Sequence, residues 1–183
     1  MEAETGGRIV DPGRLAVTLQ VLVAVETVVQ LGVGLAGGSR SSAFPALVPV
    51  LLPLIVATAV VFVRWFHRVR VNAGVFAPEA HRHSAGFAIG GWFIPFAMWW
   101  IPRKVALDTW RASGPAGGTW VVNAWWAAWL AKTVGSAIVS RVGHYPGGYS
   151  PFDQVTVVVL GVLAILFVRQ LTERQKAQAE FGA

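Results

Sequence analysis

Four long apolar stretches alternate with polar segments along the chain, at residues 15–36, 44–63, 120–139 and 152–168. About 20 apolar residues in a helix cross the hydrocarbon core of a bilayer. Each stretch therefore predicts a transmembrane helix, and no series of alternating apolar and polar positions indicates strands. The pattern predicts an all-α integral membrane protein with four transmembrane helices.

The first stretch has a rival interpretation as a secretory signal peptide, because Arg8 and Arg14 precede it and small residues follow it. Its apolar core is longer than the roughly 7–15 residues of a signal peptide. It also contains Glu26 and Gln30. We therefore expect a helix that is retained in the membrane.

A fifth apolar segment contains GGWFIPFAMWWIPRK, residues 90–104. Its core, residues 86–101, would be about 24 Å long as a helix, shorter than the hydrocarbon core of roughly 30 Å. Pro95 lies near its middle, where a chain that enters and returns needs a break. The segment is either a short, tilted fifth span or a Trp/Pro-rich re-entrant or interfacial segment. An amphipathic helix is expected over residues 102–113, beginning at Pro102.

The distribution of positive charge separates these two topologies. Lys and Arg near membrane segments stay preferentially in the cytoplasm. If the segment crosses, the basic residues outside the spans divide seven against seven; if it returns, they divide twelve against two. The count predicts four spans within one membrane domain, residues 15–171, with a polar tail at 1–14, another at 172–183, and both tails cytoplasmic.

The composition agrees with a membrane protein, since 55% of the residues are hydrophobic and 13% are charged, against about 25% charged in soluble domains. The net charge of +6 comes from basic residues between apolar runs. That placement suits the bilayer and its anionic headgroups rather than nucleic acid. A protein partner in the membrane or in the cytoplasm is also compatible with this sequence, which does not identify one. The chain has no cysteine, which excludes disulfides, zinc–thiolate sites and cysteine nucleophiles.

Aromatic residues favour the same topology. Interfacial belts of Trp and Tyr flank membrane spans. We expect an inner belt of Trp65, Trp110 and Trp120, and an outer belt of Tyr145, Tyr149 and Phe152. Eight of the nine tryptophans lie between residues 92 and 129, more than a belt requires, so some should pack the segment 86–101 against the third span.

Residues 62–113 carry a specific pattern, beginning with FVRWFHRVRVNAG and ending with GWFIPFAMWWIPRKVALDTWRAS. They resemble a bacterial integral membrane protein family catalogued as domain of unknown function 4328. The matching positions are Trp65, Arg68, Asn72, Gly91, Trp92, Pro95, Pro102, Asp108, Trp110, Arg111 and Ser113. Met98 departs from the pattern, because the family often has Asn there. The resemblance implies a bacterial plasma membrane protein and supplies no activity.

Glu26 and Lys132 are the charged residues deep inside predicted spans. In the four-span topology their depths agree within about 2 Å, and intramembrane charges usually face a partner or a cavity. One hypothesis is therefore an ion pair, or a polar cavity that they share with Gln30. The alternative is that Lys132 snorkels to the interface while Glu26 is protonated.

Lys132, Ser136, Ser140 and His144 recur every four residues and share one helix face. Ser beside Lys is a nucleophile–base arrangement, so an intramembrane hydrolase can be imagined. Small residues that let helices approach closely are the simpler interpretation. The segment GVGLAG, residues 32–37, formally matches the glycine pattern of dinucleotide-binding loops. Its glycines lie inside a predicted span, so close helix packing is the interpretation here too.

His81 and His83 point apart at their spacing, with Arg82 between them, so we expect no metal and no cofactor. The leading hypothesis is a non-enzymatic membrane protein that binds a lipid, a small molecule or a protein partner at the Trp/Pro-rich segment. A small transporter or channel with a polar site at Glu26 and Lys132 is second, because such sites are built at mid-membrane. An intramembrane hydrolase is third.

Overall fold

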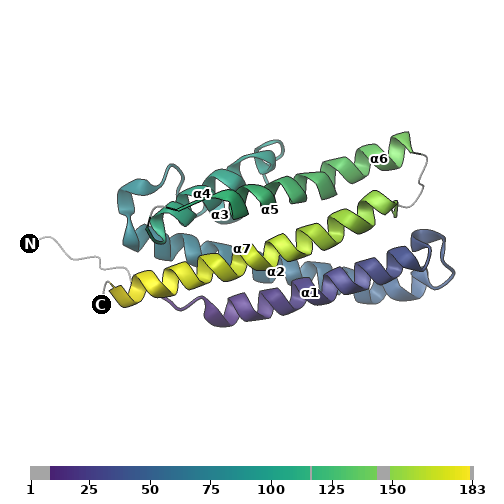
Figure 1. The fold of residues 1–183 in the computed structure, drawn as a ribbon, viewed down its shortest axis with the longest axis horizontal. Helices are drawn as coiled ribbons and strands as arrows, with labels where there is room; N and C mark the ends of the chain where they lie inside the picture. Colours follow the sequence, from purple (N-terminus) through teal and green to yellow (C-terminus); the bar gives the residue numbers. More distant parts are fainter. Residues whose placement is uncertain (1–8, 116, 144–148, 182–183) are drawn as a thin grey trace, which may run out of the picture.

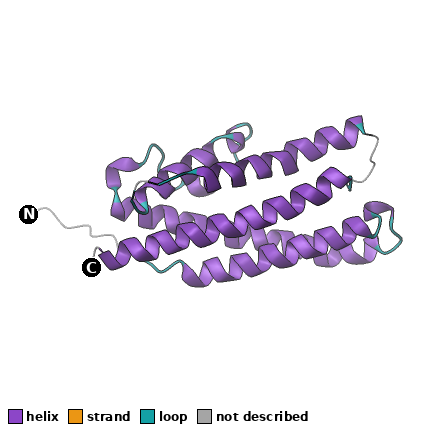
Figure 2. Cartoon of the chain, viewed as in Figure 1, coloured by secondary structure: helices purple, strands orange, loops and turns teal. Residues whose placement is uncertain are grey.

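The computed structural model describes residues 9–115, 117–143 and 149–181, and every regular element in these ranges is helical (Figure 2). Three helices are long, namely α1 (Gly13–Leu35), α2 (Phe44–Phe76) and α7 (Pro151–Phe181). The shorter helices are α3 (Phe87–Gly90), α4 (Ile101–Ala112), α5 (Trp120–Leu130) and α6 (Ser136–Val142). Single turns complete the fold: η1 (Gly38–Arg40), η2 (Pro78–Ala80), η3 (Ala97–Trp99) and the π-helical η4 (Ala131–Gly135).

Helices α1, α2 and α7 are long and apolar enough to cross a membrane, whereas the sequence predicted four such helices. The remaining predicted span is divided, since the π-helical η4 separates α5 from α6 within residues 120–142. Large apolar side chains are exposed along the outer faces of α1, α2 and α7. Such continuous apolar surface is typical of a protein surrounded by lipid.

The long helices form an elongated bundle in which α1 packs against α7 and α2, and α5 packs against α7 (Figure 1). Helix α1 begins, and α7 ends, at the same end of the bundle, which we call the termini end. An ion pair between Lys176 Nζ and Asp11 Oδ1, 4.0 Å apart, lies there. Gly13 lies beside this ion pair. A side chain at this position would crowd the pair, because a Cβ would lie 2.8 Å from Lys176 Nζ.

Several of the largest fully buried side chains belong to the halves of α2 and α7 nearer the termini end. Trp65, Phe66, Phe167 and Leu171 are fully buried there. This burial corrects the expected inner aromatic belt, because Trp65 and Trp110 lie inside the protein. Helix α2 continues past the apolar stretch and packs against α4 and α7, so its aromatic residues face the core. Trp120 is 59% exposed; His144 and Tyr145 lie outside the described residues.

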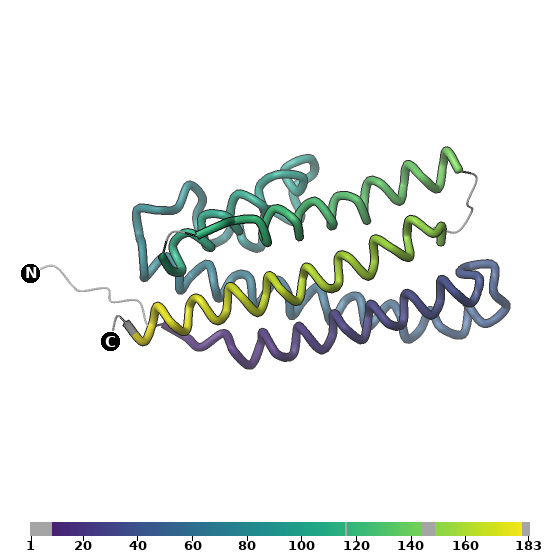
Figure 3. The backbone as a smooth tube through the Cα atoms, viewed as in Figure 1, coloured from purple at the N-terminus to yellow at the C-terminus, as the bar shows by residue number. Residues whose placement is uncertain are grey.

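The chain between α2 and α5 leaves α2 at the termini end, extends along the bundle and returns to that end before α5 begins (Figures 1 and 3). It reverses direction at Phe96, whose φ of 66° is rare for a residue with a side chain. The Ala97 N–H donates to the Pro95 carbonyl oxygen at 2.8 Å, which closes a γ-turn around Phe96. We call residues 86–101 the hairpin segment.

Candidate functional site

A cavity of about 520 Å³ lies between α1, α2, α5, η4, α7 and the hairpin segment. Its volume falls in the range of small-molecule sites in proteins, roughly 300–1,000 Å³. The hairpin segment contributes Trp92 and Phe93, and α1 contributes Glu26 and Gln30. The cavity therefore combines an apolar lining with a few polar groups, which is the usual composition of a ligand site.

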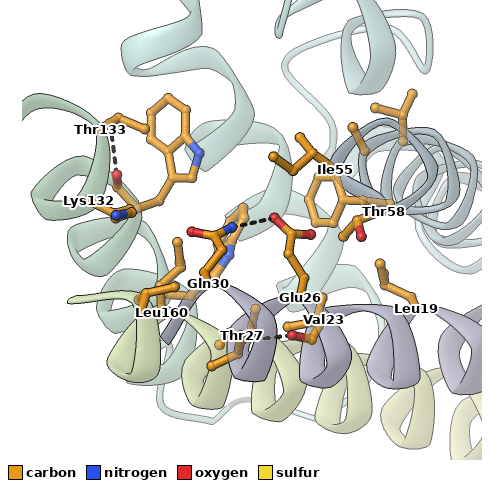
Figure 4. A pocket seen from close by; sticks show the side chains of 18 of the residues that line it. Leu19, Val23, Glu26, Thr27, Gln30, Ile55, Thr58, Lys132, Thr133 and Leu160 are labelled. Atoms are coloured by element: carbon orange, nitrogen blue, oxygen red, sulfur yellow. Dashed lines mark hydrogen bonds between the residues drawn. The ribbon is translucent and has the colours of Figure 1, made fainter. Parts of the chain in front are cut away.

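Glu26 and Gln30 extend from neighbouring turns of α1 into the cavity, opposite Lys132 (Figure 4). The spacing of four residues places both side chains on one helix face. The Gln30 Nε2 donates to Glu26 Oε1 at 2.8 Å. The sequence had singled out both residues, and the structure brings them together at the cavity wall.

Three threonine hydroxyls at the cavity are already used by their own helices. Thr27 donates to the Val23 carbonyl at 2.7 Å, Thr58 to the Leu54 carbonyl at 2.9 Å, and Thr133 to the Trp129 carbonyl at 2.8 Å. These bonds are the normal way for a threonine inside a helix to satisfy its hydroxyl. Among the described polar groups, the Glu26 carboxylate and the Lys132 ammonium thus carry the charge at the cavity.

Lys132 lies in the π-helical η4 and forms an ion pair with Asp153 at the beginning of α7. The Lys132 Nζ and Asp153 Oδ1 are 3.5 Å apart, and the Asp153 side chain is 3% exposed. Asp153 Oδ2 also accepts hydrogen bonds from the Ser150 amide at 2.9 Å and the Ser150 hydroxyl at 2.6 Å. These contacts fix the carboxylate toward η4.

This ion pair corrects the hypothesis that Lys132 pairs with Glu26. Glu26 and Lys132 were expected at matching depths in the first and third spans, whereas the partner of Lys132 is an acid at the beginning of α7. The other form of the hypothesis, a shared polar cavity, agrees with the structure, because Glu26, Gln30 and Lys132 line one cavity. Ser136 does not line it, and its Oγ is buried. No hydrogen bond joins Ser136 to Lys132 among the described residues, and the Ser–Lys nucleophilic pair stays a hypothesis.

Aromatic rings form one wall of the cavity. Trp92 lies edge-on to Phe62 of α2 at 5.4 Å and to Trp129 of α5 at 5.6 Å between ring centroids. Trp125 is 6.3 Å from Trp92 in the same cluster. Edge-to-face pairs at these distances are favourable beyond their buried area. Trp92 therefore joins the hairpin segment to both α2 and α5.

Other residues of the hairpin segment divide between the bundle and its surroundings. The rings of Trp99 and Trp129 are 5.6 Å apart, and Met98 is half-buried. In contrast, Trp100 is 49% exposed, and the turn residue Phe96 is 75% exposed. The segment thus presents aromatic side chains on two sides, one toward the helices and one outward.

Most family-motif residues lie at the termini end and not at the cavity. Asn72 holds the chain before α1 with two hydrogen bonds, accepting from the Val10 amide at 3.1 Å and donating to the Val10 carbonyl at 2.8 Å. It also donates to Gln175 Oε1 at 3.2 Å. Gln175 Nε2 donates in turn to the Val69 carbonyl at 2.7 Å and to Ser113 Oγ at 2.9 Å. These bonds connect four parts of the chain.

Two further motif residues, Trp65 and Trp110, connect α7 to its neighbours near these hydrogen bonds. The Trp65 indole N–H donates to Thr172 Oγ1 at 3.2 Å, which joins α2 to α7. The guanidinium of Arg174 lies 4.7 Å above the Trp110 ring and donates to the Pro115 carbonyl at 2.7 Å. We name the side chains of Trp65, Asn72, Ser113, Thr172 and Gln175 the polar network.

The motif acid Asp108 is 5% exposed and lies within 4 Å of two arginines. Its Oδ1 is 3.8 Å from Arg111 Nη1 and 3.9 Å from Arg82 Nε. Burial lowers the pKa of nearby His81, and the positive charge of Arg70 lowers it further. His81 is accordingly neutral at pH 7, which lets the loop after α2 pack against α4 without an additional buried charge.

The remaining motif residues shape the hairpin segment or its surroundings. A Cβ at Gly91 would lie 2.7 Å from the Phe87 carbonyl oxygen and 2.8 Å from Ile101 Cγ2, so a side chain there does not fit. Pro102 is buried in the first turn of α4, where proline is favoured. Pro95 is the first residue of the γ-turn, and its carbonyl oxygen accepts the closing hydrogen bond. Arg68 Nη1 donates to the Asp11 carbonyl at 3.4 Å on the surface.

Sequence reasoning missed Asp153, Thr172 and Gln175. The last two carried a signal in their positions, because Thr172 and Gln175 continue the helical spacing of the apolar residues Val168 and Leu171. Asp153 carried no such periodic signal. Its acidic side chain at a helix beginning is equally typical of a solvated first turn.

The comparisons with known proteins agree with the motif. No curated protein and no solved structure matches the chain. The profile of the family described as Domain of unknown function (DUF4328) matches residues 29–173. That range includes the hairpin segment, Lys132 and Asp153, and it confirms the resemblance carried by residues 62–113. The chain therefore belongs to the family Domain of unknown function (DUF4328).

Proposed function

We propose that this protein is a non-enzymatic, multi-pass protein of the bacterial plasma membrane, and that the cavity binds an amphipathic small molecule or a lipid. The observation that carries the proposal is the 520 Å³ cavity, with Glu26 and Gln30 on one side and Trp92, Trp125 and Trp129 on another. A polar group would lie at Glu26, and an apolar body would lie against the indole rings.

The proposed topology has four membrane-crossing helices, α1, α2, α7 and the composite of α5, η4 and α6. The composite contains 23 residues in a continuous run, residues 120–142, which corresponds to about 34 Å as a helix. The hairpin segment enters and leaves from the cytoplasmic side, where both termini also lie. The twelve-to-two division of basic residues supports this orientation. So does the common end of the bundle at which α1 begins, α2 ends and α5 begins.

The binding proposal is tested by filling the cavity. Ala59 of α2 lines it, whereas the next residue, Val60, faces outward and is 51% exposed. Ala59→Phe should occupy part of the cavity, and Val60→Phe, the matched control, should leave it open. Native mass spectrometry of the purified protein should detect a retained small molecule or lipid with the wild type and Val60→Phe. Equal retention by Ala59→Phe would contradict the proposal, as would no retained molecule in any of the three.

A small transporter or channel is the second candidate. The observation that favours it is that a carboxylate and an ammonium group, those of Glu26 and Lys132, line one cavity beside a π-helical turn. π-Helical turns inside α-helices often occur at functional sites. Transport predicts that proteoliposomes with the protein accumulate or release a cavity ligand faster than protein-free liposomes. Binding without such flux would leave the first proposal and exclude the second.

A further inference from the structure

We infer that the occupant of the cavity is a hydrophobic organic cation, with the Glu26 carboxylate as its counter-ion. This inference rests on the proposed function and specifies the chemical class of the ligand. It follows from three properties of the described residues: the charges at the cavity, the partners of those charges, and the rings that surround them.

The charges at the cavity are not balanced. Lys132 is paired with Asp153 at 3.5 Å, so its positive charge is already offset by a buried carboxylate. Glu26 accepts a hydrogen bond from Gln30, a neutral amide, and forms no ion pair with any cation among the described residues. The three ionisable groups together therefore carry one more negative than positive charge when all are ionised.

A carboxylate without a cationic partner is costly at the depth of an apolar span. A ligand cation at the cavity would supply that partner. An anionic ligand would meet the opposite situation, because the Glu26 carboxylate repels it and the Lys132 ammonium group is held by Asp153. The sign of the unpaired charge thus favours cations over anions of the same shape.

The aromatic wall favours the same class. Trp92, Trp125, Trp129 and Phe62 line the cavity together, and the faces of such rings carry negative potential that attracts cations. Tryptophan is the strongest of these partners, and aromatic cages are a common way to bind quaternary ammonium groups. A ligand that fills the cavity would displace water from around Glu26, which strengthens the attraction between the two.

Three probes of similar shape and different charge test this inference: tetraphenylphosphonium, tetraphenylborate and triphenylphosphine oxide. Isothermal titration calorimetry would use the full chain in nanodiscs of neutral lipid, with empty nanodiscs to correct for partition into lipid. We expect the wild type to bind the phosphonium cation at least about tenfold more tightly than the borate anion or the neutral oxide. Glu26→Gln should lose at least about tenfold in phosphonium affinity, and Glu26→Asp should keep the preference for the cation.

The control variant is Glu173→Gln, because Glu173 pairs with Arg169 on the surface and both side chains are well exposed. It should bind all three probes as the wild type does. Equal affinities of the wild type for the three probes would overturn the inference, and so would an unchanged phosphonium affinity in Glu26→Gln. Because the first comparison uses only the wild type, it does not depend on the folding of a variant. Binding without charge preference would leave the proposed function intact, whereas no binding of any probe would count against both.

Discussion

Removing the Gln175 side chain should destabilise the termini end of the bundle. Gln175 is 2% exposed and makes three hydrogen bonds, with Asn72, the Val69 carbonyl and Ser113. Each buried bond contributes about 0.5–1.5 kcal/mol, and a buried group left unpaired costs about 1–3 kcal/mol. The cavity created by truncation adds to this cost. We therefore expect Gln175→Ala to lower the free energy of unfolding by about 3 kcal/mol.

Thermal unfolding of the detergent-solubilised chain, followed by circular dichroism, measures this effect. For a chain of this size, about 3 kcal/mol corresponds to a decrease in Tm of about 6–12 °C. Gln178→Ala is the matched control, because it makes the same chemical change one turn further along α7 at a half-buried position. Gln178→Ala should lower the free energy of unfolding by no more than about 0.5 kcal/mol. Equal Tm values for the two variants would refute the reasoning that the polar network stabilises the fold.

Three further predictions follow from the charged groups and the close packing. Lys132→Met and Asp153→Asn should each destabilise the protein, and the double mutant should cost less than the sum of the two. Lys132 and Glu26 share a cavity but form no ion pair, so their double mutant should deviate less from additivity. Burial lowers the pKa of His81 in the folded chain from its ordinary value of 6.5. At pH values below about 6.5 the unfolded chain therefore binds the proton more readily than the folded one. The free energy of unfolding should therefore decrease as the pH falls below about 6.5, and this pH dependence of Tm should be weaker in His81→Gln. Gly91→Val should lower Tm, because its side chain overlaps Phe87 and Ile101, whereas Gly90→Val, with nothing near its Cβ, should have a smaller effect.

The helical class and three of the long apolar helices could be predicted from the sequence, because hydropathy and length alone determine whether a helix can cross a bilayer. The family motif was equally visible, since it depends on residue identity and spacing. The division of the predicted third span was not visible. Hydropathy carries no signal for the π-helical η4, where Gly135 packs so closely that a Cβ would lie 2.8 Å from the Phe152 ring.

The partners of buried polar residues were less predictable. Glu26 was recognised because a charge deep inside an apolar span is unusual, and Gln30 because it lies one helical turn further along. The partner of Lys132 was missed, because pairing between helices depends on their rotation and relative height, which hydropathy does not report. Trp65 was assigned to a lipid interface for a similar reason. Its burial depends on α4 and α7 covering the extension of α2.

The account depends most on the topology of the hairpin segment, because Trp92 and Phe93 reach the cavity from it. The chain has no cysteine, so the single substitutions Ser42→Cys and Gly117→Cys report on opposite ends of the bundle. A membrane-impermeant maleimide applied to intact cells should label Ser42→Cys, and should label Gly117→Cys only after the cells are permeabilised. Labelling of both positions from outside would make residues 86–101 a fifth span and would contradict the account.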